Sequence, residues 1–233
     1  MRKLGIGEVD LVKRLFFGFV VLSTVISLNS IAMASTLTIE TWGLGQSVSA
    51  GADPYGNGHP ADGGWVGTFK VTADGIAGVK DGSFWTFCLE LNEDIDEWGD
   101  TYNAVVNTKT VAGGVNGGSP DPLSSDTAWL YNEYLLGNQT IDTDAEGKLF
   151  QEAIWALEGE IALSYVNGST GHSNYNQYYQ AAIAQTDWTG DYIGNVRVLN
   201  LTDTSGNLKQ DVLATVPLPG AVWLLGSGLL GLV

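Results

Sequence analysis

The order of the periodic segments along the chain constrains its fold more than any single motif. Up to residue 106, apolar and polar residues alternate in short segments, which is the pattern of half-buried strands. The expected strands are residues 36–42, 65–71, 84–91 and 102–106. A stretch rich in Gly and Pro, residues 112–125, follows them and indicates a boundary between subdomains.

Helical spacing dominates the segments after this boundary. The expected helices are residues 124–138, 144–160 and 175–186, and residues 192–201 alternate again as a closing strand. For the first helix, Ser125 or Asp126 is the expected N-cap, and Gly137 follows the last turn. Strands, then helices, then a strand predict an α+β fold. We expect an antiparallel β-sandwich or barrel-like core with a helical subdomain inserted before the last strands.

The first 34 residues have the features of a secretory signal peptide. Four basic residues precede an apolar stretch, and Ala32 and Ala34 form an Ala-x-Ala cleavage site. The alternative is an uncleaved membrane anchor. We therefore expect export, with one extracellular domain over residues 35–215.

The net charge limits the partners of the exported chain. Without residues 1–34, six basic and 24 acidic residues remain, a formal net charge of −18. Such a surface repels nucleic acid and anionic lipid headgroups, and it attracts cations and basic partners. Neither His59 nor His172 has metal-ligand spacing around it, and no conventional catalytic pattern is present, so we expect neither a cofactor nor an enzyme.

The last segment, residues 216–233, combines a Pro-x-Pro motif with an apolar run. Pro217 and Pro219 precede a stretch that is shorter than the roughly 20 residues needed to span a bilayer. This segment resembles the PEP-CTERM sorting signal of bacteria that make exopolysaccharide, although Leu218 stands in the place of glutamate and no basic residues follow. The resemblance implies an exosortase-type sorting enzyme as a partner, contact with the membrane only through this segment, and a place at the bacterial surface or in the biofilm matrix.

Cys88 is the single cysteine, and export makes it unusual. A lone cysteine in an oxidising compartment is a buried inert thiol, half of an intermolecular disulfide, or a reactive site. Free cysteine is among the most buried residue types, which favours the first of these.

A second motif favours the reactive site. The segment LFQEAIW places Gln151 on the second predicted helix. Together with the FCLE segment around Cys88, it resembles the thioester domains of Gram-positive surface adhesins. The resemblance implies that the Cys88 thiol condenses with the Gln151 side-chain amide and expels ammonia. It also implies that hydrophobic residues shield the bond from water; the candidates are Phe84, Trp85, Phe87, Phe150, Ala153, Ile154 and Trp155.

A thioester suits covalent attachment because its carbonyl is more electrophilic than that of an amide and its thiolate leaves readily. An amine or hydroxyl of a surface protein or polysaccharide would attack once, which gives a covalent tether for adhesion or matrix attachment.

The acidic run after Cys88 is a second candidate site. Its carboxylates offer oxygen ligands for Ca²⁺, with Asp94 and Asp96 in positions that imitate an EF-hand loop. The candidate ligands are Glu90, Glu93, Asp94, Asp96 and Glu97. The alternatives are a solvated loop, or a charge that attracts a lysine toward the thioester.

Two other functions compete with covalent attachment. One is a passive structural protein of the exopolysaccharide matrix, with Cys88 as an inert buried thiol. The other is a carbohydrate-binding module that presents aromatic side chains; the candidates are Trp98, Trp188, Tyr175, Tyr178 and Tyr179.

Overall fold

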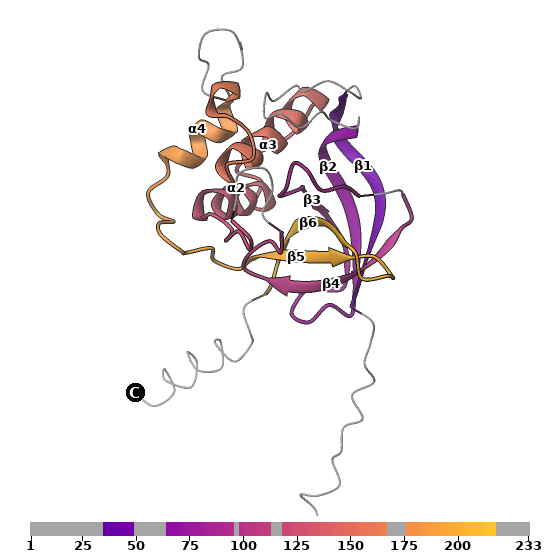
Figure 1. Cartoon of the computed structure of the whole chain (residues 1–233). Coiled ribbons are helices and arrows are strands. Elements are labelled where there is room, and N and C mark those ends of the chain that lie inside the picture. The colour runs from indigo at the N-terminus through magenta and orange to yellow at the C-terminus, as the bar shows by residue number, and fades with distance from the viewer. Residues whose placement is uncertain (1–34, 49–63, 96–97, 113–117, 167–175, 218–233) are drawn as a thin grey trace, which may run out of the picture. The chain divides into compact units, whose positions relative to one another are not determined.

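Six antiparallel strands form one curled sheet, which three helices cover on one side (Figure 1). The computed structural model describes residues 35–48, 64–95, 98–112, 118–166 and 176–217. The order across the sheet is β3-β2-β1-β4-β5-β6. The strands are β1 Thr36–Val48, β2 Gly64–Asp74, β3 Gly82–Thr86, β4 Thr101–Asn107, β5 Val196–Thr202 and β6 Leu208–Thr215.

The curl of the sheet begins in the long pair β1 and β2. Their register shifts twice, between Ile39 and Thr41 and between Trp42 and Gly45, and such bulges bend a strand and increase its twist. At the second shift the two backbones approach so closely that a Cβ on Gly45 would lie 2.4 Å from the Val66 carbonyl oxygen. A glycine at this position therefore permits the bend.

A seam between the two edge strands closes the sheet into a barrel-like core. Beyond Thr86 the chain leaves β2 and pairs with β6. The Leu89 amide donates to the Asp211 carbonyl at 3.0 Å, and the Leu213 amide donates to the Phe87 carbonyl at 3.4 Å. Cys88 lies between these two bonds and bridges to Val212.

The three helices lie between β4 and β5 in the sequence. They are α2 Ser125–Leu135, α3 Asp144–Leu157 and α4 Gln177–Ala184, and a 3₁₀ turn, η1 Leu163–Tyr165, precedes α4. The Thr143 side chain caps α3 by accepting from the Glu146 amide at 3.2 Å, as expected of an N-cap threonine. Asn176 caps α4, and its side-chain amide also donates to the Leu149 carbonyl at 2.6 Å, which ties α4 to α3.

Helix α3 approaches the sheet at Gly147. A Cβ on this residue would lie 2.1 Å from the Leu44 carbonyl oxygen, so only glycine permits the observed distance between helix and strand. One turn earlier, Asp144 accepts a hydrogen bond from the Gly45 amide at 3.4 Å. The bulged part of β1 therefore sets the position of α3 and of every side chain that it carries.

Two hydrophobic clusters stabilise the fold. One fills the interior of the curled sheet and includes Ile39, Phe69 and Leu201. The other lies between the sheet and the helices and includes Phe87 and Phe150. Cys88 packs against both clusters.

The predicted α+β fold is confirmed, including the barrel-like core and the helices inserted before the last strands, but several boundaries were wrong. Residues 84–91 are not one strand, because β3 ends at Thr86. The closing strand begins at Val196 rather than at residue 192, and β6 was not predicted. The N-cap of α2 is Ser124, which accepts from the Thr127 amide at 3.1 Å, rather than Ser125 or Asp126.

The contact at Gly147 predicts a reversal of ordinary helix propensity. In an unconstrained helix, Gly→Ala stabilises by about 1 kcal/mol. Here Gly147→Ala should instead lower the free energy of unfolding by about 2 kcal/mol, because the new methyl group overlaps backbone. Urea unfolding measures the change. Gly64→Ala, where the methyl group meets nothing within 4 Å, is the control and should be close to neutral. Equal effects at the two positions would contradict the prediction.

Candidate functional site

Cys88 and Gln151 lie together and bind each other through two reciprocal hydrogen bonds. The Cys88 amide donates to Gln151 Oε1 at 3.0 Å, and Gln151 Nε2 donates to the Cys88 carbonyl at 2.8 Å. The two residues are 63 positions apart in the sequence, and Gln151 is only 1% exposed. The structure therefore brings together the two residues of the predicted cross-link.

The pairing follows from the position of Cys88 at the seam. The bonds to β6 are made by the residues on either side of Cys88, which is the arrangement of a non-hydrogen-bonded antiparallel pair. The N–H and C=O of Cys88 consequently point away from β6, where β2 no longer pairs because its ladder with β3 ends at Thr86. The side-chain amide of Gln151 takes the place of a neighbouring strand, which satisfies both buried groups.

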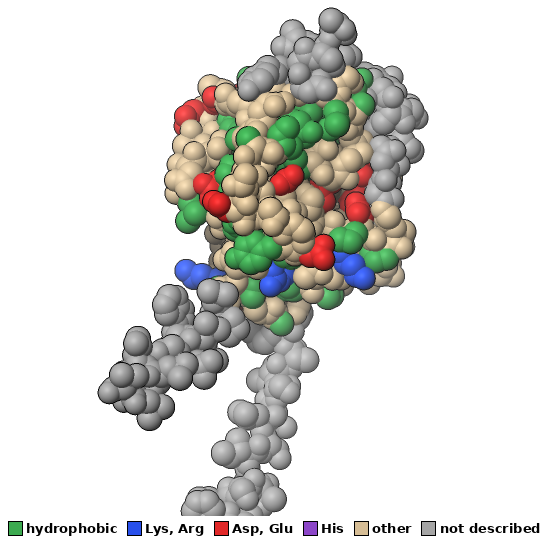
Figure 2. All heavy atoms as spheres, turned by 90° about the vertical axis from the view of Figure 1, so that its left-hand side faces the viewer, with side chains coloured by type: hydrophobic (Ala, Val, Ile, Leu, Met, Phe, Trp, Pro, Cys, Tyr) green, Lys and Arg blue, Asp and Glu red, His purple; other side chains and the backbone are tan. Residues whose placement is uncertain are grey.

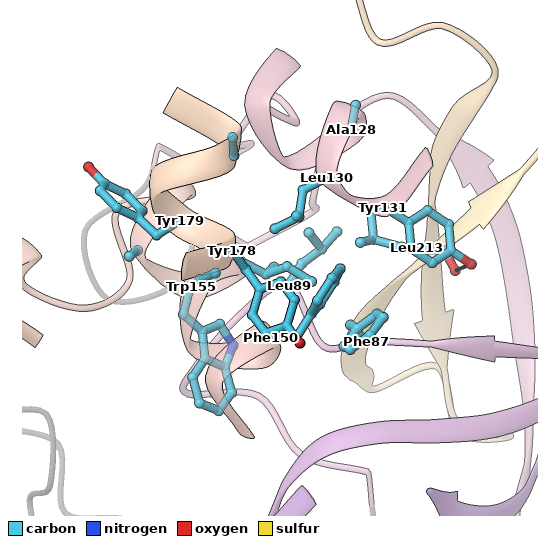
Figure 3. Packing of buried hydrophobic residues seen from close by; sticks show 14 of the residues in the cluster. Phe87, Leu89, Ala128, Leu130, Tyr131, Phe150, Trp155, Tyr178, Tyr179 and Leu213 are labelled. Carbon is cyan, nitrogen blue, oxygen red and sulfur yellow. Dashed lines mark hydrogen bonds between the residues drawn. The ribbon is translucent and has the colours of Figure 1, made fainter. Parts of the chain in front are cut away.

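Most of the predicted shielding residues belong to a buried cluster against which Cys88 packs. Five of them are buried, in the cluster between sheet and helices. They are Phe87, Phe150, Ala153, Ile154 and Trp155. The Phe87 and Phe150 rings stack with centroids 4.6 Å apart, and Tyr178 packs on Phe150 at 4.9 Å (Figure 3).

Two other predicted shielding residues lie farther out. Phe84 is half-buried and packs toward the barrel interior, and Trp85 is exposed on the opposite side of β3. They were therefore less apt candidates than the five buried residues.

The Cys88 thiol is held in its protonated form. Burial raises its pKa far above the ordinary value, and the negative charges of Asp94 and Glu93 raise it further. The residue as a whole keeps some accessible surface and is half-buried. Reaction at this thiol therefore needs a group that removes its proton.

A group of carboxyl side chains lies beside the seam. Its members are Glu90, Glu93, Glu160 and Asp211, which repel one another electrostatically. Burial raises the pKa of Glu90 to about 8, and the charges of Glu160, Glu93 and Asp211 add to this shift. Glu90 is 3% exposed, and its Oε2 is buried without a hydrogen-bond partner among the described residues.

Two further carboxyls of this group also have raised pKa values. Burial raises the pKa of Glu93 to about 7, with the charges of Asp211 and Glu160 contributing. Burial also raises the pKa of Asp211 to about 6, although hydrogen bonds from Val111, Asn200 and Leu201 oppose the shift. The group therefore holds protons near neutral pH instead of carrying its full negative charge.

This arrangement changes the interpretation of the acidic run. Within the described ranges, no three His, Cys, Asp or Glu side chains are grouped so that they could hold a metal ion, and Asp96 and Glu97 lie outside those ranges. Glu90 is buried and does not belong to a solvated loop, whereas Asp94 is exposed. Asp211 was missed because it belongs to the strand that was not predicted, where a charged residue interrupts the apolar pattern.

Of the four described aromatic candidates for glycan binding, two are buried. Tyr178 and Tyr179 are buried, so the prediction that they face a ligand was wrong; their rings belong to the helix-sheet core (Figure 3). Trp98 is 55% exposed and packs edge-on against Trp42 with centroids 5.9 Å apart. Trp188 is half-buried against Tyr192.

Several predicted features lie outside the described residues. They are the signal peptide, Tyr175, both histidines, Pro219 and the apolar run after it. Pro217 is exposed and is the last residue described. Among the helices that the structure describes, none has the length and apolarity to cross a bilayer.

Comparison with known proteins adds no relative. No protein-family model, no curated protein and no solved structure matches the chain.

The carboxyl group predicts how stability depends on pH. The folded-state pKa of Glu90, about 8, lies above the ordinary value of 4.5, so folding favours its protonated form. Its stabilising contribution is complete below about pH 4.5 and is lost as the pH rises through 8. The test uses the Cys88→Ala variant as the parent, so that no thioester can form. Between pH 5 and 8 the free energy of unfolding of this parent should fall. Adding Glu90→Gln should make that fall smaller by about 2 kcal/mol, a figure that allows for solvent screening.

Urea unfolding at pH 5, 6, 7 and 8 measures this effect. The exposed Asp191→Asn serves as the control and should leave the pH dependence unchanged. If Glu90→Gln declines as steeply as its parent, the assignment of the titration to Glu90 is wrong.

Proposed function

We propose that the chain is an exported protein of a bacterial surface or matrix in which Cys88 and Gln151 form an internal thioester for covalent attachment to a partner. The observation that carries the proposal is the pair of reciprocal hydrogen bonds between these residues. The resemblance of their two motifs to adhesin thioester domains points to the same pair.

The geometry suits formation of the bond. The Cys88 thiol attacks Cδ of Gln151, a bond forms between Sγ and Cδ, and the bond from Cδ to Nε2 breaks to release ammonia. Negative charge develops on Oε1 as the thiol attacks, and the Cys88 amide already donates to this atom at 3.0 Å. It therefore acts as an oxyanion donor without rearrangement, as in acyl-transfer enzymes.

The surroundings suit preservation of the bond. Cys88 packs against a cluster that contains buried aromatic rings, and such rings exclude bulk water, which slows hydrolysis. Cys88 as a residue is only half-buried, which leaves an approach for a small nucleophile. A partner amine or hydroxyl then attacks Cδ, Cys88 leaves as the thiol, and the partner stays linked to Gln151 through an amide or an ester. The reaction occurs once, so the protein is a covalent tether and not an enzyme.

The surface charge favours a basic attacking group. Figure 2 shows acidic side chains spread over the face that it presents, while the Lys and Arg side chains lie along its lower part. With a formal net charge of −16 for the whole chain, long-range attraction favours lysine-bearing partners. Export, processing by an exosortase-type enzyme and association with exopolysaccharide complete the proposal; they rest on the two terminal segments of the sequence.

The second candidate is a non-covalent matrix or carbohydrate-binding protein with an inert Cys88. One observation favours it: Trp98 is largely exposed beside Trp42, and exposed indole rings stack on sugars. Glycan binding that survives Cys88→Ala would support this function over the thioester.

Intact mass of freshly purified protein tests the thioester. The wild type should be lighter than its formula by one ammonia, and methylamine should add to it. Cys88→Ala, Gln151→Ala and the near-isosteric Gln151→Glu should each have the full formula mass and should not react with methylamine. Gln151→Glu is the matched control because it preserves the size and shape of the side chain.

A wild type at full formula mass that takes up thiol reagents as fast as an exposed cysteine would contradict the proposal. Hydrolysis is recognised separately, because it leaves glutamate at position 151, which peptide mapping detects.

A further inference from the structure

Formation and opening of the thioester both require proton transfer, for which the Cys88–Gln151 pair has no group of its own. The thiol must lose a proton, since burial holds it in the protonated form. The departing Nε2 must gain a proton to leave as ammonia. The Cys88 amide stabilises only the oxyanion.

Glu93 is placed beside this reaction by the seam. Its Oε2 accepts a hydrogen bond from the Asp211 amide at 3.4 Å. Asp211 also accepts from Leu89 at 3.0 Å, and the next residue, Val212, bridges to Cys88. The Gln210 amide donates to the Asp94 carbonyl at 3.3 Å, which holds the segment after Glu93 along β6 as well. The Glu93 carboxyl is thereby held against β6, the strand that pairs with Cys88, and its charge acts on the thiol.

We propose that Glu93 is the acid–base residue of the Cys88–Gln151 thioester. This inference rests on the proposed function. In formation, the Glu93 carboxylate takes the proton of Sγ as the bond from sulfur to Cδ forms. It then gives that proton to Nε2 as the bond from Cδ to nitrogen breaks, so that ammonia leaves and the carboxylate is restored.

Capture of a partner also uses Glu93, which again first accepts a proton and then donates it. Glu93 takes a proton from the attacking amine as its nitrogen bonds to Cδ, and gives it to Sγ as the thioester bond breaks. The products are an amide at Gln151 and the free Cys88 thiol. No further reactant is needed.

The neighbouring carboxyls are less suited to this role. Asp211 accepts from Val111 at 3.0 Å, from Asn200 at 2.9 Å and from Leu201 at 3.3 Å, so its oxygens are occupied. Glu160 is fully buried and accepts from the Leu91 amide at 3.1 Å.

Glu90 and Asp94 differ from Glu93 in exposure. Glu90 is almost completely buried, whereas Asp94 is exposed, although its charge acts on Cys88 too. Glu93 is half-buried, and its pKa of about 7, raised by burial and by the charges of Asp211 and Glu160, is near the optimum for taking and giving a proton at neutral pH.

Glu93→Gln, compared with Asp94→Asn, tests the assignment in the full chain. The readouts are the fraction of fresh protein that lacks one ammonia, and the rate of methylamine addition between pH 6 and 9. The rate is divided by the concentration of unprotonated methylamine at each pH, because only the free amine attacks. For Glu93→Gln we expect less thioester, a normalised rate lower by about 100-fold, and loss of the rise of the normalised wild-type rate through neutral pH. Asp94→Asn removes an equal charge near the same thiol and should retain the rate within about threefold and the wild-type pH profile.

The contribution of Glu93 to the pH profile also has to be distinguished from that of neighbouring acidic groups. Glu90, Glu160, Asp211 and Asp94 face Glu93 or Cys88, so Glu90→Gln is measured in parallel. It should shift the midpoint of the profile without removing it.

Chemical rescue separates proton transfer from a structural role. In Glu93→Ala, added formate should restore thioester formation and methylamine addition, which a merely structural carboxyl would not allow. If circular dichroism shows that Glu93→Gln does not fold, the same rates are measured for Glu93→Asp, and the formate rescue of Glu93→Ala decides the assignment.

A wild-type rate and pH profile in Glu93→Gln, or an equal loss in Asp94→Asn, would overturn the inference and leave the thioester standing. A wild type without ammonia loss would overturn the proposed function, and this inference with it.

Discussion

The pairing of residues 87–89 with β6 is the interaction on which the rest of the structure depends. It closes the sheet by joining its two edges, through the bonds of Leu89 to Asp211 and of Leu213 to Phe87. Tyr131 from α2 strengthens the same seam. Its hydroxyl donates to the Trp85 carbonyl at 3.0 Å and lies 3.5 Å from the Leu213 carbonyl oxygen. The seam therefore connects the barrel interior, the helical layer and the position of Cys88.

The seam also explains why a buried glutamine lies on α3. Cys88 turns its backbone groups away from β6, and leaving them unpaired in this environment would cost about 1–3 kcal/mol each. Gln151 satisfies both, and the same two hydrogen bonds place its amide carbon near the only thiol. The two hydrogen bonds therefore stabilise the fold, and they also bring together the two residues that the proposed thioester would join.

Burial of acidic side chains beside the seam has a cost in stability at alkaline pH. Carboxyl groups that are close together and poorly solvated favour their protonated forms. The raised pKa values of Glu90 and Glu93 are the result. Proteins commonly retain such groups near reactive centres, because a group that titrates near neutral pH can move protons there. Glu93, which accepts a hydrogen bond from the Asp211 amide of β6, is such a group beside Cys88.

The sequence by itself determined the fold class and the order of the first five strands and the three helices, and it pointed to Cys88 and Gln151 as a candidate pair, because periodicity and short motifs are local properties. Only the tertiary structure decided that residues 84–91 divide at Thr86, that β6 closes the barrel, and that Glu160 and Asp211 join Glu90 and Glu93 in one group. Tyr178 and Tyr179 illustrate the same limit, since their spacing did not reveal that α4 turns them inward. The physical reason is that burial and strand pairing depend on contacts between residues far apart in the chain, and local pattern does not encode them.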